Sequence, residues 1–475
     1  MSKHTPKSVA QEPSCTDLGS VGSAPRYPEI LAVNPVLHVG IDDTDSPSKG
    51  CTTYIAALLV PELLRLSCSF IDYPNLVRLN PNVPWKTRGN GAICLRLTCE
   101  ESAIEVAVKA IVQVVERNSD LADVRADPAI AYLKGDVPAK LANFSKRAIR
   151  GLVTVGEAEE VAARHGVSRI TIKGRKGFVG ALAAVGEQLR SDHTYELIAY
   201  RTRQDTFRPR SVDPESVLRM DKETAPLTFN NVDPETNRIL ITPRGRDPIL
   251  YGIRGETPSA VLQAHKIVKA SEEIERWVIF RTNHGTDDHY SQASKISDIH
   301  PNQPAVLFGK VLKKPLTIPG GHVIFQLGDD SAAVDCAAYE PTGNFRNTVK
   351  KLVEGDLIEA YGGIRKSTST HPRTLNLEKI RVVRLAQCFR YENPHCPNCH
   401  KRMESAGRGQ GFRCRKCGAN ARMANRTPIQ IERDLALGVY IPPARANRHL
   451  TKPILRYGRE KTDSQIRLTE PWHWP

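Results

Sequence analysis

The chain has 475 residues, of which 40% are hydrophobic and 25% charged, and its formal net charge is +15. This composition is ordinary for a globular protein, and the length allows roughly three or four domains. No apolar run approaches the roughly 18 residues that a membrane-spanning helix needs, and the first residues lack an apolar signal core, so we expect a cytoplasmic protein.

The predicted elements fall into segments of different pattern. Residues 1–35 are rich in Ser, Pro, Gly and Lys without any period, which predicts a disordered arm. Residues 36–127 predict an α/β domain with strands at 36–41 and 91–97 and helices at 52–66 and 104–115. Residues 128–300 predict a mixed sheet with helices on one face, from helices at 139–150 and 181–189 and strands at 168–173 and 195–200.

The last third of the chain has shorter elements. Residues 301–390 predict five strands, at 306–312, 322–327, 332–339, 357–362 and 375–383, with a helix at 345–352 after the third. This order is that of an OB-fold barrel. Residues 391–420 form a cysteine-rich module, and residues 421–475 form a basic C-terminal tail, with a helix expected at 429–437.

Two Cys-x-x-Cys pairs are the strongest local motif. Cys396 and Cys399 are followed by Cys414 and Cys417. Each pair can place two thiolates on one tight turn, and two such turns complete a tetrahedral, structural zinc site. The alternative is a set of unmetallated thiols. The other seven of the 11 cysteines are expected to be buried or idle thiols, because a reducing compartment disfavours disulfides.

Three aspartates follow the first buried strand. Asp42, Asp43 and Asp45 would repel one another unless a cation or a proton neutralises them, and hard carboxylate oxygens suit Mg²⁺ delivered with nucleotide phosphates. The loop after them enters a helix near Thr52, whose free backbone N–H groups could receive an anion. The alternative is that these side chains only cap turns and the helix.

Three further segments are weaker signals. The Gly-Asn-Gly turn after Arg88 permits a close approach to a ligand but also suits a hairpin. The glycine-spaced basic segment 173–180 could hold a phosphate at a helix start or be an ordinary turn. The polar loop 280–290 could line a cleft or be a solvated linker.

The positive charge is concentrated at the C-terminal end. Residues 391–475 carry 16 lysines and arginines against 7 acidic residues. A local basic surface of this kind usually faces nucleic acid phosphate, although a solubilising face is the alternative. The sequence therefore favours an RNA- or DNA-binding protein.

Several motifs in one order resemble the archaeal tRNA(Ile) 2-agmatinylcytidine synthetase family (TiaS), over about residues 36–458. They are Gly40-Ile-Asp-Asp-Thr-Asp-Ser46, Gly50-Cys-Thr-Thr-Tyr54, Thr87-Arg-Gly-Asn-Gly-Ala92, Asp192 to Arg201, Tyr251 to Glu256, Arg281 to Asn283 with Gly285 to Asp287, Cys336 to Pro341, and the four cysteines.

The resemblance implies a multidomain α/β and α+β protein with a kinase-like domain, a ferredoxin-like domain, an OB-fold and a zinc ribbon. It implies a carbon–nitrogen ligase that uses ATP, magnesium and zinc. The enzyme would phosphorylate the carbonyl oxygen of the wobble cytidine in a CAU-anticodon isoleucine tRNA and then let agmatine displace the phosphate, while ATP ends as AMP and phosphate. The modified tRNA would read AUA, and no obligate protein partner is indicated.

The resemblance also implies roles for individual residues. Catalytic roles fall to Asp42, Asp43, Asp45, Thr52 and Arg88, with the three aspartates holding magnesium and Thr52 matching a threonine implicated in autophosphorylation. Nucleotide-binding roles fall to Lys49, Gly50, Thr53, Gly89, Asn90 and Gly91. Asn283 and Asp287 would help to bind agmatine.

The chain departs from the family pattern at the N-terminal arm, at His284, where glutamine is usual, and at Tyr290, where leucine is usual. The alternative function is a non-catalytic RNA-binding protein built from the OB-fold and the zinc ribbon. That protein would consume no nucleotide and would not need the three aspartates.

Overall fold

The computed structural model describes residues 34–46, 50–86, 89–202, 208–291, 294–462 and 466–475. Almost all of the predicted disordered arm of residues 1–35 therefore lies outside the described residues. Residues 35–475 form one unit of contacts. Among the described residues, no helix is long and apolar enough to cross a lipid bilayer.

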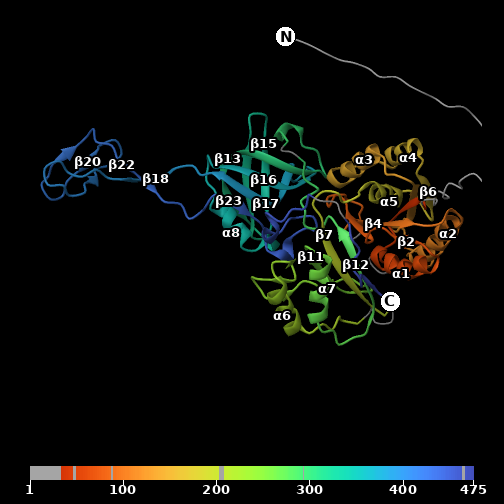
Figure 1. The fold of residues 1–475 in the computed structure, drawn as a ribbon. Helices are drawn as coiled ribbons and strands as arrows, with labels where there is room; N and C mark the ends of the chain where they lie inside the picture. The colour runs from red at the N-terminus through yellow and green to blue at the C-terminus, as the bar shows by residue number, and fades with distance from the viewer. Residues whose placement is uncertain (1–33, 47–49, 87–88, 203–207, 292–293, 463–465) are drawn as a thin grey trace, which may run out of the picture. The chain divides into compact units, whose positions relative to one another are not determined.

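A large sheet runs through the first two thirds of the chain (Figure 1). Its main path in the described residues is β6-β5-β1-β4-β3-β12-β7-β11-β8, with β2 beside β4 and β24 beside β12. The strands are β1 Val36–Asp42, β2 Ser69–Phe70, β3 Asn75–Arg78, β4 Gly91–Thr98, β5 Ala129–Lys134, β6 Ser168–Thr171, β7 Thr194–Arg201, β8 Thr228–Phe229, β11 Ile249–Gly255, β12 Ile274–Thr282 and β24 His473–Trp474.

One parallel pair joins the two halves of this sheet. β3 pairs with β12 in parallel, through Asn75 opposite Arg281, whereas the neighbouring pairs β3–β4 and β12–β7 are antiparallel. β5 pairs with β1 and β6 pairs with β5. The domain boundary that we expected after residue 127 therefore falls inside one continuous sheet.

The helices that cover the sheet follow from the spacing of apolar residues. They are α1 Thr52–Arg65, α2 Glu101–Asn118, α3 Ala139–Arg150, α4 Val155–Arg164, α5 Gly177–Gly186, α6 Pro214–Thr224 and α7 Pro258–Ile267. In α2 the buried residues Ile104, Ala107, Ile111 and Val115 recur every three or four positions, which places them on one face.

Helix α5 differs from the others because it is apolar all round and almost wholly buried. It packs against α3 on one side and against β1 and β5 on the other. It begins at Gly177, four residues before the predicted start at residue 181. Glycines at 177 and 180 are poor helix formers by themselves, so the sequence pattern did not extend the helix back to them.

The OB-fold prediction is confirmed. The strands are β13 Pro304–Ile318, β14 His322–Gly328, β15 Ala333–Ala338, β16 Leu357–Arg365 and β17 Thr374–Arg384, with helix α8 Phe345–Lys350 after the third. The order β15-β14-β13-β16-β17 is closed by a parallel β15–β17 pairing, which makes a barrel. A short strand, β23 Gly438–Tyr440, extends this sheet beside β17.

The segment around the four cysteines is built from short strands. β19 Glu404–Ser405, β20 Phe412–Arg413 and β21 Asn420–Ala421 form one small sheet, and β18 Cys388–Glu392 pairs with β22 Thr427–Ile431. The helix predicted at 429–437 is wrong, because Ile429 and Ile431 belong to β22. The backbone N–H and C=O groups of this segment form hydrogen bonds with β18. This pairing requires an extended backbone, which excludes a helix here.

The expectation that no cysteines outside the two pairs form disulfides is also wrong. Cys68 and Cys99 are joined by a disulfide, with their Cα atoms 4.5 Å apart. The pairing of β2 with β4 sets Ser69 opposite Thr98, so the two cysteines that flank this pair face each other. This register depends on a strand pairing between distant segments, which the spacing of 31 residues in the sequence did not reveal.

The C-terminal segment, residues 441–475, returns to the large sheet. Trp472 is buried, its ring lies 5.2 Å from Phe70 and 6.2 Å from Tyr73, and β24 pairs with β12. The Tyr73 hydroxyl donates to the Arg467 carbonyl at 3.2 Å. The segment is thus a folded part of the main unit rather than a solvated tail.

Candidate active site

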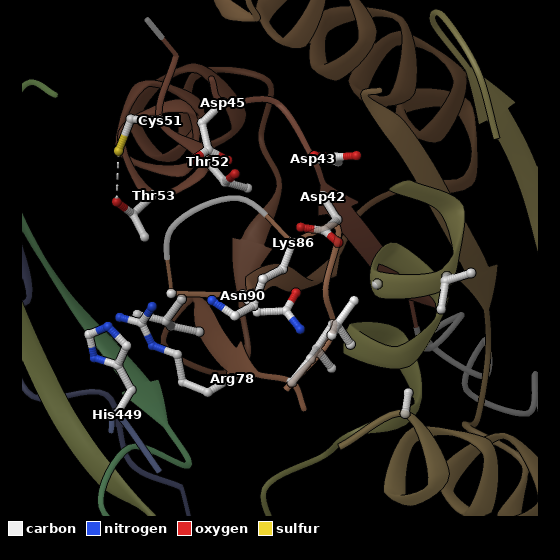
Figure 2. Close-up of a pocket in the computed structure, with 18 of the residues that line it drawn as sticks. Asp42, Asp43, Asp45, Cys51, Thr52, Thr53, Arg78, Lys86, Asn90 and His449 are labelled. Atoms are coloured by element: carbon white, nitrogen blue, oxygen red, sulfur yellow. Dashed lines mark hydrogen bonds between the residues drawn. The ribbon is translucent and has the colours of Figure 1, made fainter. Parts of the chain in front are cut away.

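A cavity of about 700 Å³ lies at the carboxyl end of β1. Its walls come from the loop after β1, the start of α1, the turn before β4, the loop before α4, the start of α5, and strands β7 and β11 (Figure 2). The lining side chains include Asp42, Asp43, Asp45, Thr52, Thr53, Arg78, Lys86, Gly89, Asn90, Gly91, Lys176, Glu196, Asp247, Arg254 and His449. The structure therefore brings together groups from distant segments of the chain.

The three aspartates form the acidic end of this cavity. Burial and the neighbouring carboxylates raise the pKa of Asp42 well above its usual value, and burial with Asp45 raises the pKa of Asp43 to about 7. Asp43 has a positive φ of 57°, which turns the chain out of β1. Carboxylates crowded together in this way are stabilised by a cation, and their hard oxygens fit Mg²⁺.

The carboxylates are neighbours without forming a compact ligand cage. Within the described residues, only the four cysteines bring three or more candidate ligand atoms within 4.8 Å of one another. In Figure 2 the side chain of Asp45 lies beside Thr52, whereas Asp42 and Asp43 lie near each other and apart from Asp45. A cation held here would therefore also need oxygen ligands from a bound phosphate or from water.

The start of α1 faces the same cavity. The Thr52 and Thr44 hydroxyls are 2.9 Å apart, and Thr53 Oγ1 lies 3.2 Å from Cys51 Sγ, as Figure 2 shows for the second pair. The side chain of Cys51, the N-cap residue, accepts no capping hydrogen bond from the first N–H groups of α1. Such a helix start favours an anion.

Helix α5 packs its first turn directly against the aspartates. A Cβ atom on Gly180 would overlap the Asp42 carboxylate, so any larger residue at this position would have to displace that carboxylate. Lys176, immediately before the helix, lines the cavity, and its backbone N–H donates to the Asp127 carboxylate at 2.9 Å. The glycine-spaced segment 173–180 is thus part of the site, an outcome that its sequence left open.

The turn before β4 contributes Gly89, Asn90 and Gly91 to the lining. Asn90 has a positive φ of 49°, and its side chain donates to the Asn80 carbonyl at 2.7 Å. This bond fixes the turn against the end of β3. The predicted site residues Arg88 and Lys49 lie outside the described residues, and Gly50 does not line the cavity in the described part of the chain.

A buried carboxylate on β7, that of Glu196, also lines the cavity. Glu196 accepts from Arg254 Nε at 2.9 Å, and Arg78 Nη2 and His284 Nδ1 each lie 3.5 Å from its second oxygen. Burial alone would raise the pKa of Glu196, but Arg254, His284 and Arg78 hold it well below its usual value. The sequence motifs predicted no individual role for Glu196, although an acidic residue between apolar neighbours in this strand was a visible signal.

The two residues predicted to bind agmatine have other contacts. The Asn283 side chain accepts from the Arg78 N–H at 2.7 Å and donates to the Arg78 carbonyl at 3.0 Å. Asp287 forms an ion pair with Lys379 of the OB-fold and accepts from the Lys452 N–H at 2.9 Å. Neither residue lines the cavity in the described part of the chain. Asn283 instead holds the end of β3 through the backbone of Arg78, and Asp287 connects the OB-fold to the loop after β12.

The C-terminal segment also reaches the cavity, which the sequence did not indicate. His449 lines it, and its ring lies 5.1 Å from that of His284. The nearby Arg78 and burial hold the pKa of His449 well below its usual value. Many cations of this segment are held in ion pairs with the rest of the main unit, as in Arg445 with Asp233 and Arg456 with Glu256.

The four cysteines converge as predicted. Cys396 Sγ lies 3.4 Å from Cys417 Sγ, and Cys399 Sγ lies 3.5 Å from Cys414 Sγ. Backbone N–H groups at Cys417 and Lys416 help to lower the pKa of Cys414 to about 6, which favours the thiolate. Four thiolates at this spacing are the donor set of a closed structural zinc site.

Comparison with protein families divides the chain into four matched regions. Residues 38–174 match the TiaS TCKD domain, residues 175–289 the TiaS FLD domain, residues 305–383 an OB-fold nucleic acid binding domain, and residues 393–435 the TiaS C-terminal zinc ribbon domain. Together these family models cover most of the described chain.

Whole proteins of similar sequence and structure give the same result. The chain is 40% identical over 426 residues to the 2-agmatinylcytidine synthetase TiaS of Methanocaldococcus jannaschii, covering 88% of this chain and 98% of that protein. It is 39% identical to the protein in a crystal structure of TiaS in complex with its isoleucine tRNA and ATP, with a TM-score of 0.79. It is 37% identical to the protein in the complex of TiaS with the same tRNA, AMPCPP and agmatine, with a TM-score of 0.77. Each of these two comparisons covers 89% of this chain and 97% of the chain in the solved structure.

Proposed function

This chain belongs to the tRNA(Ile) 2-agmatinylcytidine synthetase (TiaS) family, and from that premise we propose that it ligates agmatine to the wobble cytidine of a CAU-anticodon isoleucine tRNA at the expense of ATP. The reaction is that of a carbon–nitrogen ligase. The observation that carries the proposal is a single cavity lined both by the aspartates after β1 and by residues of β7 and β11. Such a cavity can hold a nucleotide, a base and an amine together.

The chemistry requires two steps. A cytosine carbonyl oxygen is a poor leaving group, so the oxygen first receives a phosphoryl group from ATP. The primary amine of agmatine then attacks the same carbon, and phosphate leaves. Phosphoryl transfer alone leaves ADP, so water must also cleave the bond between the α and β phosphates for ATP to end as AMP and two phosphates. Phosphoryl transfer depends on positioning and on electrostatic stabilisation more than on covalent chemistry by the protein.

The acidic end of the cavity suits the ATP phosphates. Asp42, Asp43 and Asp45 would hold Mg²⁺, which would neutralise phosphate charge during transfer. Lys176 and the start of α1 supply positive groups on either side of the aspartates. Thr52, buried among these groups, is the residue that we propose for autophosphorylation.

The wall on β7 and β11 suits agmatine and the base. It combines apolar side chains, among them Ile198 and Ile249, with the charged groups of Glu196 and Arg254. Since Asn283 and Asp287 lie outside this lining, we propose that they act on agmatine indirectly, through Arg78 and through the OB-fold contact. A base entering the cavity must leave its stack in the anticodon loop.

Nucleoside analysis tests the proposed function directly. After incubation of isoleucine tRNA with protein, ATP and agmatine, mass spectrometry is expected to show cytidine converted to agmatinylcytidine, and omission of ATP should abolish the product. tRNA whose anticodon does not begin with cytidine is the matched control. Tight tRNA binding without any modified nucleoside would instead support the alternative, a non-catalytic RNA-binding protein.

The four-cysteine cluster is proposed to hold one zinc ion per chain. Cys399→Ser is expected to release the zinc and unfold the small module, because metal binding supplies most of the folding free energy of such modules. tRNA affinity should then fall while ATP binding persists. Elemental analysis measures the zinc, and Cys388→Ser, outside the cluster, is the control. Wild-type protein without metal after gentle purification would contradict the assignment.

A further inference from the structure

A second cavity of about 600 Å³ lies next to the first. The two cavities share Arg78, Lys86, Gly89 and His449, so they communicate at the turn before β4. The C-terminal segment supplies a wall of the second cavity through residues 447–450. Its described lining includes none of the three aspartates, which separates it from the acidic end of the larger cavity.

Positive charge is gathered in this smaller cavity. Lys86 and Arg448 both line it, and burial together with the charge of Arg448 lowers the pKa of Lys86. Arg78 also lines it, 3.5 Å from the carboxylate of Glu196, and the carboxylate Asp247 is paired with Arg210 at 2.8 Å. Lys86 and Arg448 repel each other, and an anion between them would relieve the repulsion.

The position of Arg448 is fixed by contacts on both sides. Its Nε lies 3.1 Å from Glu378 Oε1, and its Nη1 donates to the Pro81 carbonyl at 3.3 Å. The side chain keeps 38% of its surface exposed, so the guanidinium is held at the rim and remains open to a ligand. Arginine fixed in this way is well suited to a phosphate oxygen.

Two single atoms at the same place have no hydrogen-bond partner among the described residues. Asn447 Oδ1 is buried and accepts no hydrogen bond from the described residues, and Arg78 Nε donates none to them. The Gly89 backbone lies against the His449 ring, since a Cβ atom there would stand 2.7 Å from Nε2. The cavity thus offers both donors and an acceptor beside its cations, as a nucleotide would require.

We propose that this smaller cavity binds the phosphodiester backbone of the RNA strand next to the target cytidine, through Lys86 and Arg448. The inference rests on the proposed function. When a base is moved into a deep cavity, the flanking nucleotides stay at its mouth, and phosphate contacts there set the register of the strand. The other source of phosphate is ATP, which the aspartates would place at the opposite end of the larger cavity.

The test measures RNA binding without ATP or agmatine. An anticodon stem-loop RNA with the CAU anticodon is titrated with wild-type protein, Arg448→Gln and Lys86→Gln. Each variant is expected to bind roughly tenfold more weakly, and the slope of log affinity against log salt should fall by about 0.7 per lost phosphate contact. ATP affinity should stay unchanged in Arg448→Gln, because Arg448 is not among the described residues that line the larger cavity. Arg459→Gln, an exposed arginine of the same segment, is the control.

A modified RNA locates the phosphate. Two RNAs are made, in which a neutral methylphosphonate replaces the phosphodiester on the 5′ side or on the 3′ side of the target cytidine. The wild type should bind one of them more weakly than the unmodified RNA, by about the factor that Arg448→Gln costs with the unmodified RNA. Arg448→Gln should bind this modified RNA no more weakly than it binds the unmodified RNA, because the two changes remove the same contact.

Three outcomes decide the inference. Weaker ATP binding with unchanged RNA binding would assign the cations to the nucleotide and overturn the proposal, and so would unchanged binding of both ligands. Independent losses from the methylphosphonate and from Arg448→Gln would overturn it as well. Wild-type protein that binds the stem-loop but forms no agmatinylcytidine would refute the proposed function and leave the cavity assignment intact.

Discussion

Replacing Asp45 by asparagine is expected to reduce agmatine transfer and ATP consumption by about 10²–10³-fold, as the loss of one electrostatic stabiliser of a transition state commonly does. Asparagine keeps the size of the side chain and removes only its charge. Asp45 lines the larger cavity beside Asp42 and Asp43, where burial and mutual repulsion of the carboxylates favour a bound cation. The affinity for tRNA should hardly change, since the proposed backbone contacts lie in the other cavity.

Three measurements on this variant separate catalysis from structure. They are the melting temperature, tRNA affinity and the rate of agmatine transfer. If Asp45 only caps a turn, the variant should lose about 0.5–2 kcal/mol of stability and keep near-normal turnover at low temperature. Asp330→Asn, at an exposed position of the OB-fold, is the matched control. Full activity with a lowered melting point would remove Asp45 from the phosphoryl-transfer site.

Replacing Arg456 by methionine is expected to lower the free energy of unfolding by about 3–5 kcal/mol, the cost of leaving a buried charge without its partner. Arg456 is fully buried. Its Nε lies 2.6 Å from Glu256 Oε1, its Nη2 lies 2.8 Å from Asp192 Oδ1, and its Nη1 donates to the Gly285 carbonyl at 2.6 Å. These contacts tie the C-terminal segment to the end of β11 and to the loop before β7.

Chemical denaturation checks this expectation through the midpoint and the slope of the transition. Arg459→Met is the control, because it makes the same change at an exposed position three residues away. A loss below about 1 kcal/mol in Arg456→Met, within the range of an exposed ion pair, would contradict the role of Arg456 as a buried anchor. The remaining cation Lys461, 2.8 Å from Glu256, would then be sufficient for that carboxylate.

Most single elements could be predicted because they depend on neighbouring residues. The four cysteines lie on two tight turns, which the Cys-x-x-Cys spacing predicts. The OB-fold strands show a local alternation of buried and exposed residues. The aspartates were found because they follow a buried strand directly and are too close together to be charged without compensation. In each case the physical cause acts over a few residues, so a local pattern reports it.

The arrangement of these elements was decided only by tertiary structure. The parallel pairing of β3 with β12 joins strands of two predicted domains in one sheet, and Glu196 of β7 lines the same cavity as Asp42 of β1. The same assembly brings His449 to the turn at Gly89 and closes the disulfide between Cys68 and Cys99. Each of these contacts joins two segments that are far apart in the sequence, and neither segment alone indicates which other segment it will contact.

The C-terminal segment shows the physical reason. Its excess of lysine and arginine was correctly read as a local charge, but charge alone does not say which anion a side chain will meet. Folding buried Arg456 against Glu256 and left Arg448 at the rim of a cavity. The sequence determined how many cations the segment carries, and the packing of distant carboxylates decided which of them stay open to a ligand, because a buried charge must first be paired.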